Sequence, residues 1–91
     1  MYIIVRNETD PFTGKPCFNY LGWQEPAWDD DGYFWTSKET INDMLKEQSN
    51  GGFKYNTKDH PFLFDTKEAT SNYARKIKLG YYGRYHIIEW N

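Results

Sequence analysis

The sequence predicts a single α+β domain over residues 1–91, in which a mostly antiparallel β-sheet carries two helices packed on one face. Three observations lead to this fold class. Short segments rich in β-branched and aromatic residues are separated by turn signals. Two other segments combine a capping signal with an apolar stripe at helical spacing. A chain of 91 residues has apolar side chains for one core only.

The strands are expected in six short segments. The turn signal "DPFTG" predicts a hairpin between the first two of them, and "NTKDHP" predicts a second hairpin between the fourth and the fifth. The segments are 2–6, 16–21, 32–35, 53–55, 61–64 and 84–90.

The first helix is expected over residues 37–48. Thr36 can accept from the backbone amide three residues on, while Glu39 reaches back to form a capping box. Apolar residues of this segment fall on one face, and the glycines of "NGG" at 50–52 are expected to end it.

The second helix is expected over residues 66–78. Asp65 and Glu68 stand where Thr36 and Glu39 stand in the first, as part of a weak similarity offset by 29 positions, and Gly80 is expected to end it. Either a duplication or two uses of one strand-cap-helix solution explains this similarity.

Composition and charge limit the classes of function that are expected for this protein. Aromatic residues make up 20% of the chain, more than so small a core easily buries, so that some are expected at an interaction surface. The net charge of −2 divides into an acidic stretch over 1–65 and a basic one over 66–91. This balance fits neither a strongly basic nucleic-acid binder nor a dense acidic mimic of DNA.

The chain is expected to act in the cytoplasm. It contains no apolar run long enough for a membrane span or a signal-peptide core. Its single cysteine, Cys17, cannot form an internal disulfide, which fits a reducing compartment.

The stretch "WQEPAWDDDGYFW" at 23–35 is the first candidate site. Counted from Asp29 as a calcium loop, the sixth residue is Phe34 and the twelfth is Thr40, where glycine and glutamate are required, so that no metal site is expected. A solvated turn and a binding surface are the two remaining interpretations. As a surface it would present rigid rings beside negative charge to a basic partner protein, through Trp23, Trp28, Asp29, Asp30, Asp31 and Tyr33.

An enzyme is not expected. Cys17 lies in a predicted strand, without a helix N-terminus or a neighbouring histidine to activate it, and is expected to be a small buried apolar residue. Neither His60 nor His86 has a partner at metal-ligand spacing, and the glycines form no phosphate-binding loop. No cofactor is therefore expected.

The segment "ARKIKLGYYGRYHI" at 74–87 is the alternative site. Cations that neutralise phosphates alternate there with rings that stack on bases, which is typical of proteins that bind RNA or single-stranded nucleic acid. The same lysines also suit a helix C-terminus. The candidate residues are Arg75, Lys76, Lys78, Tyr81, Tyr82 and Arg84.

Residues 1–6 and 60–90, with "YIIVR", "FLFDTKEATSNYARKI" and "YHIIEW", resemble the small accessory proteins that tailed bacteriophages, especially T4-like phages, express early in infection. The resemblance implies a non-catalytic viral protein of the host bacterial cytoplasm that binds a host enzyme, defence factor or toxin. The expected function is therefore to inhibit or modulate a host protein during host takeover, with RNA binding as the alternative. A homodimer that pairs the edge strand 84–90 with its twin is also open.

Overall fold

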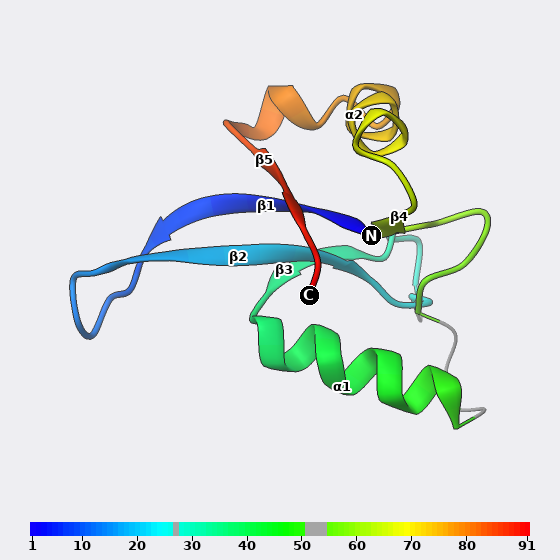
Figure 1. Ribbon diagram of the computed structural model, residues 1–91, viewed down its shortest axis with the longest axis horizontal. Helices are drawn as coiled ribbons and strands as arrows, with labels where there is room; N and C mark the ends of the chain where they lie inside the picture. The colour runs from blue at the N-terminus through cyan, green and yellow to red at the C-terminus, as the bar shows by residue number, and fades with distance from the viewer. Residues whose placement is uncertain (27, 51–54) are drawn as a thin grey trace.

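The computed structural model describes residues 1–26, 28–50 and 55–91, with Tyr82 described in its backbone only. Five strands, two α-helices and one short 3-10 helix follow one another in these ranges (Figure 1). In chain order they are β1 (Tyr2–Thr9), β2 (Pro16–Trp23), β3 (Tyr33–Thr36), α1 (Lys38–Ser49), β4 (Leu63–Phe64), α2 (Lys67–Lys76), η1 (Leu79–Tyr82) and β5 (His86–Glu89).

The five strands form one antiparallel sheet, in which β3, β2, β1 and β4 are neighbours in that order and β5 pairs with β1. Val5 pairs with both Tyr20 of β2 and His86 of β5, and Ile3 pairs with both Leu63 of β4 and Ile88 of β5. Because a strand has two edges, β5 occupies one edge of β1, while β2 and β4 follow one another along the other. The β2–β3 pair therefore diverges from β1 on the N-terminal side of Val5, where β4 takes its place.

The two helices lie on opposite faces of the sheet, so that the expectation of both helices on one face is wrong (Figure 1). Ile3 and Val5 pack in one buried cluster with Ile41 and Met44 of α1. Ile4 points the other way and packs in a second cluster with residues of α2. Side chains alternate across a strand, and three consecutive buried residues in β1 require cover on both faces. The α+β class and the antiparallel sheet are confirmed.

Both helices begin one residue later than the capping boxes predict. Ser37 and Thr66 are the N-caps, and their hydroxyls accept hydrogen bonds from the backbone amides of Thr40 and Ala69. In each segment the N-cap is the residue directly before the helix and not the residue that precedes it. Its hydroxyl accepts from the backbone amide three positions on.

The second helix ends before the glycine expected to end it. Lys76 is its last residue, and Lys78 adopts the left-handed conformation at φ 56°. The amide of Lys78 then donates to the carbonyl of Arg75 (3.0 Å) and closes the turn. Gly80 instead lies within η1.

The first predicted hairpin is confirmed, and β1 and β2 extend it to an arm that projects from the sheet. Of the second hairpin, residues 53 and 54 lie outside the described residues, as do the glycines 51 and 52 expected to end the first helix. Its other half, β4, pairs with β1. Asn56 helps to position β4, because its side-chain oxygen accepts from the amides of Phe62 (2.8 Å) and Leu63 (3.1 Å).

Truncation of Ile41 tests the α1 side of the core. Ile41 is fully buried, and its Cδ1 lies 2.9 Å from the position that a Cβ on Gly22 would take, so that it fills the space which that glycine leaves. We expect Ile41→Ala to lower the free energy of unfolding by about 2–5 kcal/mol in urea titrations. Asn42→Ala, at the exposed next position, should change it by about 0.5 kcal/mol or less. Similar effects of the two changes would contradict this packing.

Candidate functional site

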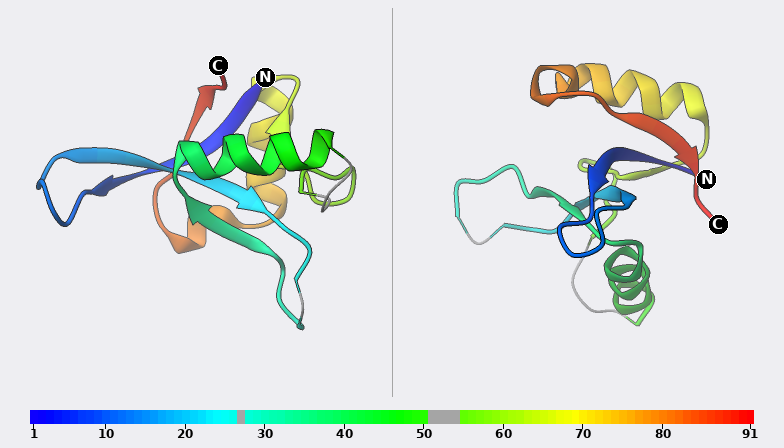
Figure 2. Two further views of the ribbon diagram at one scale, coloured as in Figure 1. Left: turned by 90° about the horizontal axis from the view of Figure 1, so that it is seen from below. Right: turned by 90° about the vertical axis from the view of Figure 1, so that its left-hand side faces the viewer.

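The β2–β3 loop, residues 24–32, carries the first candidate surface. Trp28 is 86% exposed, and the three aspartates that follow it are exposed as well. Figure 2 shows the loop extending beyond the sheet, at a level between the two helices. A large aromatic side chain is thus held in solvent, away from both buried clusters.

Hydrogen bonds within the loop hold its two ends together. The indole Nε1 of Trp23 donates to the carbonyl of Asp31 (2.7 Å), and the amide of Gln24 donates to the carbonyl of Gly32 (3.1 Å). The side chain of Asp30 accepts from the amide of Gly32 (3.3 Å), and that of Asp31 accepts from the amide of Tyr33 (3.0 Å). Two of the three aspartates therefore act as turn-forming residues.

The structure separates the six residues predicted for partner binding. Trp23 is buried in the α1-side cluster, with 5% exposure, and its ring stacks on His60 with 4.6 Å between centroids. Tyr33 is half-buried at the base of the loop. Trp28 and Asp29 project from the loop, whereas Asp30 and Asp31 are exposed but also bind its backbone. An aspartate before glycine is the sequence signal for such a turn.

Glycine is required at position 32 by both conformation and space. Its φ is +83°, and a Cβ built there would lie 2.5 Å from the carbonyl oxygen of Gln24 and 2.5 Å from the Nε1 of Trp23. Real Cβ atoms do not approach other atoms so closely. Any side chain at this position must therefore open the loop or displace the Trp23 ring.

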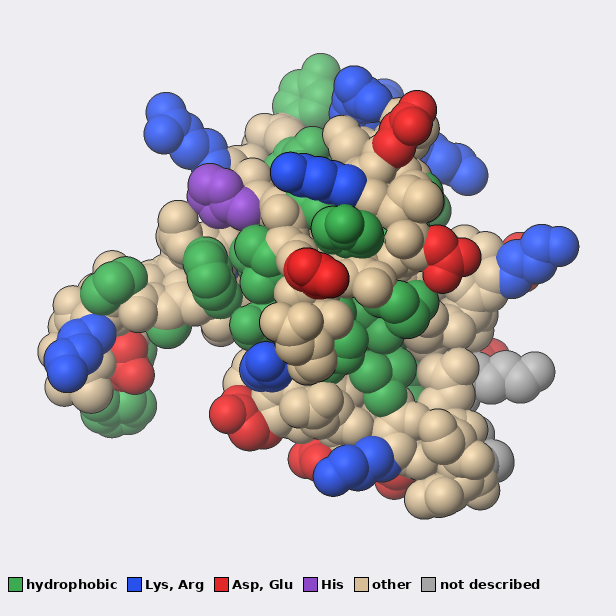
Figure 3. Space-filling model, viewed as in Figure 1, with side chains coloured by type: hydrophobic (Ala, Val, Ile, Leu, Met, Phe, Trp, Pro, Cys, Tyr) green, Lys and Arg blue, Asp and Glu red, His purple; other side chains and the backbone are tan. Residues whose placement is uncertain are grey.

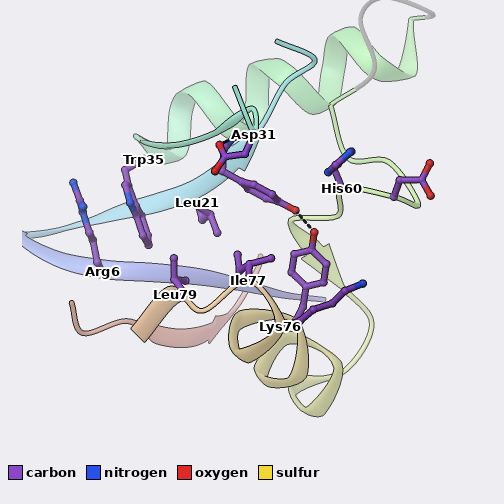
Figure 4. A pocket seen from close by; sticks show the side chains of 11 residues that line it. Arg6, Leu21, Asp31, Trp35, His60, Lys76, Ile77 and Leu79 are labelled. Carbon is purple, nitrogen blue, oxygen red and sulfur yellow. Dashed lines mark hydrogen bonds between the residues drawn. The ribbon is translucent and has the colours of Figure 1, made fainter. Parts of the chain in front are cut away.

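A cleft of 740 Å³ lies next to the loop, between the β2–β3 pair and the α2–η1 segment (Figure 4). It exists because α2 packs on β1, β4 and β5 and leaves this face of β2 and β3 uncovered. Residues that the sequence did not single out as a site line most of it. The lining consists of Arg6, Leu21, Asp31, Tyr33, Trp35, Asp59, His60, Tyr73, Lys76, Ile77 and Leu79.

A pair of tyrosines bridges this cleft. The hydroxyl of Tyr33 donates to that of Tyr73 (2.6 Å) and lies 3.1 Å from the carbonyl oxygen of Pro61. Burial raises the pKa of Tyr33 well above its usual value, and the hydrogen bond with Tyr73 adds to that effect. Tyr33 therefore keeps its proton, and its hydrogen bond with Tyr73 ties β3 to α2.

The described residues of the predicted nucleic-acid surface do not share one site. Arg75, Lys78 and Tyr81 line a shallow groove of 380 Å³ together with Gly80 and Tyr85. Lys76 lies in the cleft, with its Nζ 5.8 Å from the ring of Tyr73. Arg84 is exposed outside both linings, and the side chain of Tyr82 lies outside the described part of the structure.

The candidates for catalysis are dispersed. Cys17 is exposed on the projecting β1–β2 arm, which corrects the expectation that it is buried. Cys17 pairs across the hairpin with Glu8, and it is exposed because no helix covers this part of the arm.

In the described ranges, no three histidine, cysteine or acidic side chains come close enough to hold a metal ion. The helices of these ranges are also too short or too polar to cross a membrane.

Two glycines of positive φ allow a test of the close packing inside the β2–β3 loop. Gly14, at φ +70°, has nothing within 4 Å of the position that a Cβ would take, whereas Gly32 has the close contacts given above. We expect Gly14→Ala to cost about 1 kcal/mol in the free energy of unfolding, from conformation alone. Gly32→Ala should cost at least about 2 kcal/mol more and change the near-ultraviolet circular dichroism of tryptophan. Equal costs would show that the loop tolerates a side chain at position 32.

Comparison of the chain with models of protein families, with curated proteins and with solved structures finds no match. The family of this chain is therefore not established by similarity. Its own geometry offers three features that can bind another molecule: the projecting β2–β3 loop, the cleft beside it and the groove of Arg75 and Tyr81.

Proposed function

We propose that this protein is a non-catalytic binding protein that inhibits or modulates a partner protein through its β2–β3 loop. The observation that carries the proposal is the exposure of Trp28 at 86% on a loop whose base is held by hydrogen bonds. A tryptophan in solvent contributes nothing to the folded core. Buried in a partner's pocket, it becomes the kind of residue that dominates interface energetics.

The construction of the loop favours binding. Because Asp30, Asp31 and the Trp23 indole fix the backbone, little conformational freedom remains at its base to be lost on association. Preorganisation of this kind increases affinity without adding any contact.

The charge of the loop indicates what kind of surface it binds. Glu25 and Asp29 are exposed on either side of Trp28, and the carboxylates of Asp30 and Asp31 add to the negative potential. A positively charged surface around an apolar pocket complements this arrangement and speeds encounter. The resemblance of residues 1–6 and 60–90 to phage accessory proteins adds the expectation that the partner is a host protein.

Removal of Trp28 tests this proposal against a matched control. Phe12, at 95% exposure on the tip of the β1–β2 arm, is an equally exposed ring elsewhere on the molecule. After a partner is captured from bacterial lysate with ribonuclease present, we expect Trp28→Ala to weaken its binding roughly 30-fold, the effect of about 2 kcal/mol. Phe12→Ala should leave the affinity unchanged in the same calorimetric titration.

Asp29→Lys is the second variant. The substitution reverses one charge of the loop and leaves the turn hydrogen bonds of Asp30 and Asp31 in place. It should slow association and reduce the salt dependence of binding. If the captured partner binds both variants with native affinity, its interface lies outside this loop.

A second candidate function is binding of RNA or single-stranded nucleic acid, favoured by the groove of Arg75, Lys78, Tyr81 and Tyr85. Tyr81 is 87% exposed there, as a ring available for stacking on a base. Cationic and anionic side chains are interspersed over the face that Figure 3 shows, so that this face has no strong positive electrostatic potential. The second candidate therefore depends on a local contact and not on the charge of the whole protein.

Substitutions in the groove separate the two functions. If the groove binds single-stranded RNA, Arg75→Glu with Tyr81→Ala should abolish the binding of a labelled oligonucleotide at low salt, measured by fluorescence anisotropy. The same protein should keep its protein partner. Absence of binding by the unmodified protein at low salt would rule out this candidate, because phosphate contacts are strongest there.

A further inference from the structure

One end of the cleft has walls that are mainly apolar. Leu21 and Leu79 are buried, at 3% and 8% exposure, while Trp35 and Ile77 are half-buried and face the opening. Figure 4 places Trp35 on the sheet side and Leu79 and Ile77 on the opposite side, with Leu21 between them. This end is thus a slot with an indole on one wall and branched aliphatic side chains on the other.

Arg6 stands at the edge of this slot and holds its guanidinium over the Trp35 ring (Figure 4). Its guanidinium carbon lies 4.6 Å from the centre of the Trp35 ring. Its Nε forms an ion pair with Glu8 that is not aligned as a hydrogen bond. The terminal nitrogens carry the other N–H donors, in a planar arrangement that suits a carboxylate or a phosphate.

Three other ionisable side chains of the cleft, those of Asp31, His60 and Lys76, lie or point elsewhere. Figure 4 shows His60 on the far side of the Tyr33–Tyr73 bridge and the end of Lys76 directed to that side. Asp31 accepts from the amide of Tyr33 and so binds its own loop. The bridge separates the Arg6 end from the His60 end.

We propose that the Arg6 end of the cleft binds a small planar aromatic acid. The ring lies between Trp35 and the side chains of Ile77 and Leu79, and the acidic group accepts hydrogen bonds from the terminal nitrogens of Arg6. Contact with the edge of the Trp35 ring and burial of apolar surface supply the affinity. The fork of Arg6 supplies the preference for an anion.

The Arg6 end is one part of a cleft of small-molecule size. The whole cleft measures 740 Å³, within the roughly 300–1,000 Å³ typical of small-molecule pockets. The tyrosine bridge crosses it, so that the Arg6 end accepts a compact ligand more readily than a continuous chain. This site differs from the surface of Trp28 and does not depend on the proposed protein partner.

The test compares 2-naphthoate with 2-naphthamide, two flat probes of nearly equal shape that differ in charge. Each is titrated into nitrogen-15-labelled protein and followed by NMR. We expect the largest shifts at the Trp35 indole and at the amides of Leu21, Ile77 and Leu79. The acid should bind roughly tenfold more tightly than the amide, the effect of one charged hydrogen bond.

Substitutions of arginine complete the experiment. Arg6→Gln should remove the tenfold preference for the acid, whereas Arg84→Gln, which removes the same charge outside the cleft, should preserve it. Arg6→Lys keeps the charge without the fork and should give an intermediate preference.

Three outcomes would overturn the proposal. They are no shift in the cleft at the solubility limit of 2-naphthoate, equal affinity for acid and amide, and largest shifts at the groove of Arg75 and Tyr81. The acid–amide comparison is made on the unmodified protein, so that a folding defect in the Arg6 variants cannot decide the result.

Discussion

The arrangement of the whole fold follows from one constraint, that strand β1 must be buried on both faces. Ile3 and Val5 point to one side of the strand and Ile4 to the other, and all three have at most 1% of their surface exposed. A helix on one face alone would leave one of these sets in water, at a cost of about 1.5–3 kcal/mol for each side chain. The packing of α1 below the sheet and α2 above it satisfies this constraint.

The same strand also organises the places where other molecules can bind. Because β2 leaves β1 on the N-terminal side of Val5 and β4 takes over that edge, the β2–β3 pair extends to one side of the sheet, and the loop of Trp28 extends with it. Meanwhile α2 covers the β1, β4 and β5 half of its face. The uncovered half of β2 and β3 becomes the floor of the cleft, and Tyr33 spans the opening to reach Tyr73.

The aromatic residues therefore have three different roles. Trp23 belongs to the core, where its indole also closes the β2–β3 loop. Trp35 and Tyr33 line the cleft. Trp28, Phe12 and Tyr81 lie in solvent on three separate projections or surfaces. A high aromatic content thus indicates that interaction surfaces exist, and burial decides which rings form them.

Elements with a local cause can be inferred from the amino-acid sequence alone. Hairpin turns and helix caps use neighbouring residues, so that the first hairpin could be found and both helices could be placed to within one or two residues. Long-range packing sets which faces the helices cover, buries Trp23 while Trp28 stays exposed, and brings Arg6 and Ile77 into the lining of one cleft. These facts depend on contacts between residues far apart in the chain, which a periodic pattern does not encode. The run Asp29, Asp30 and Asp31 illustrates the difference, because three chemically identical side chains take different roles. Those of Asp30 and Asp31 accept from the backbone amides of Gly32 and Tyr33.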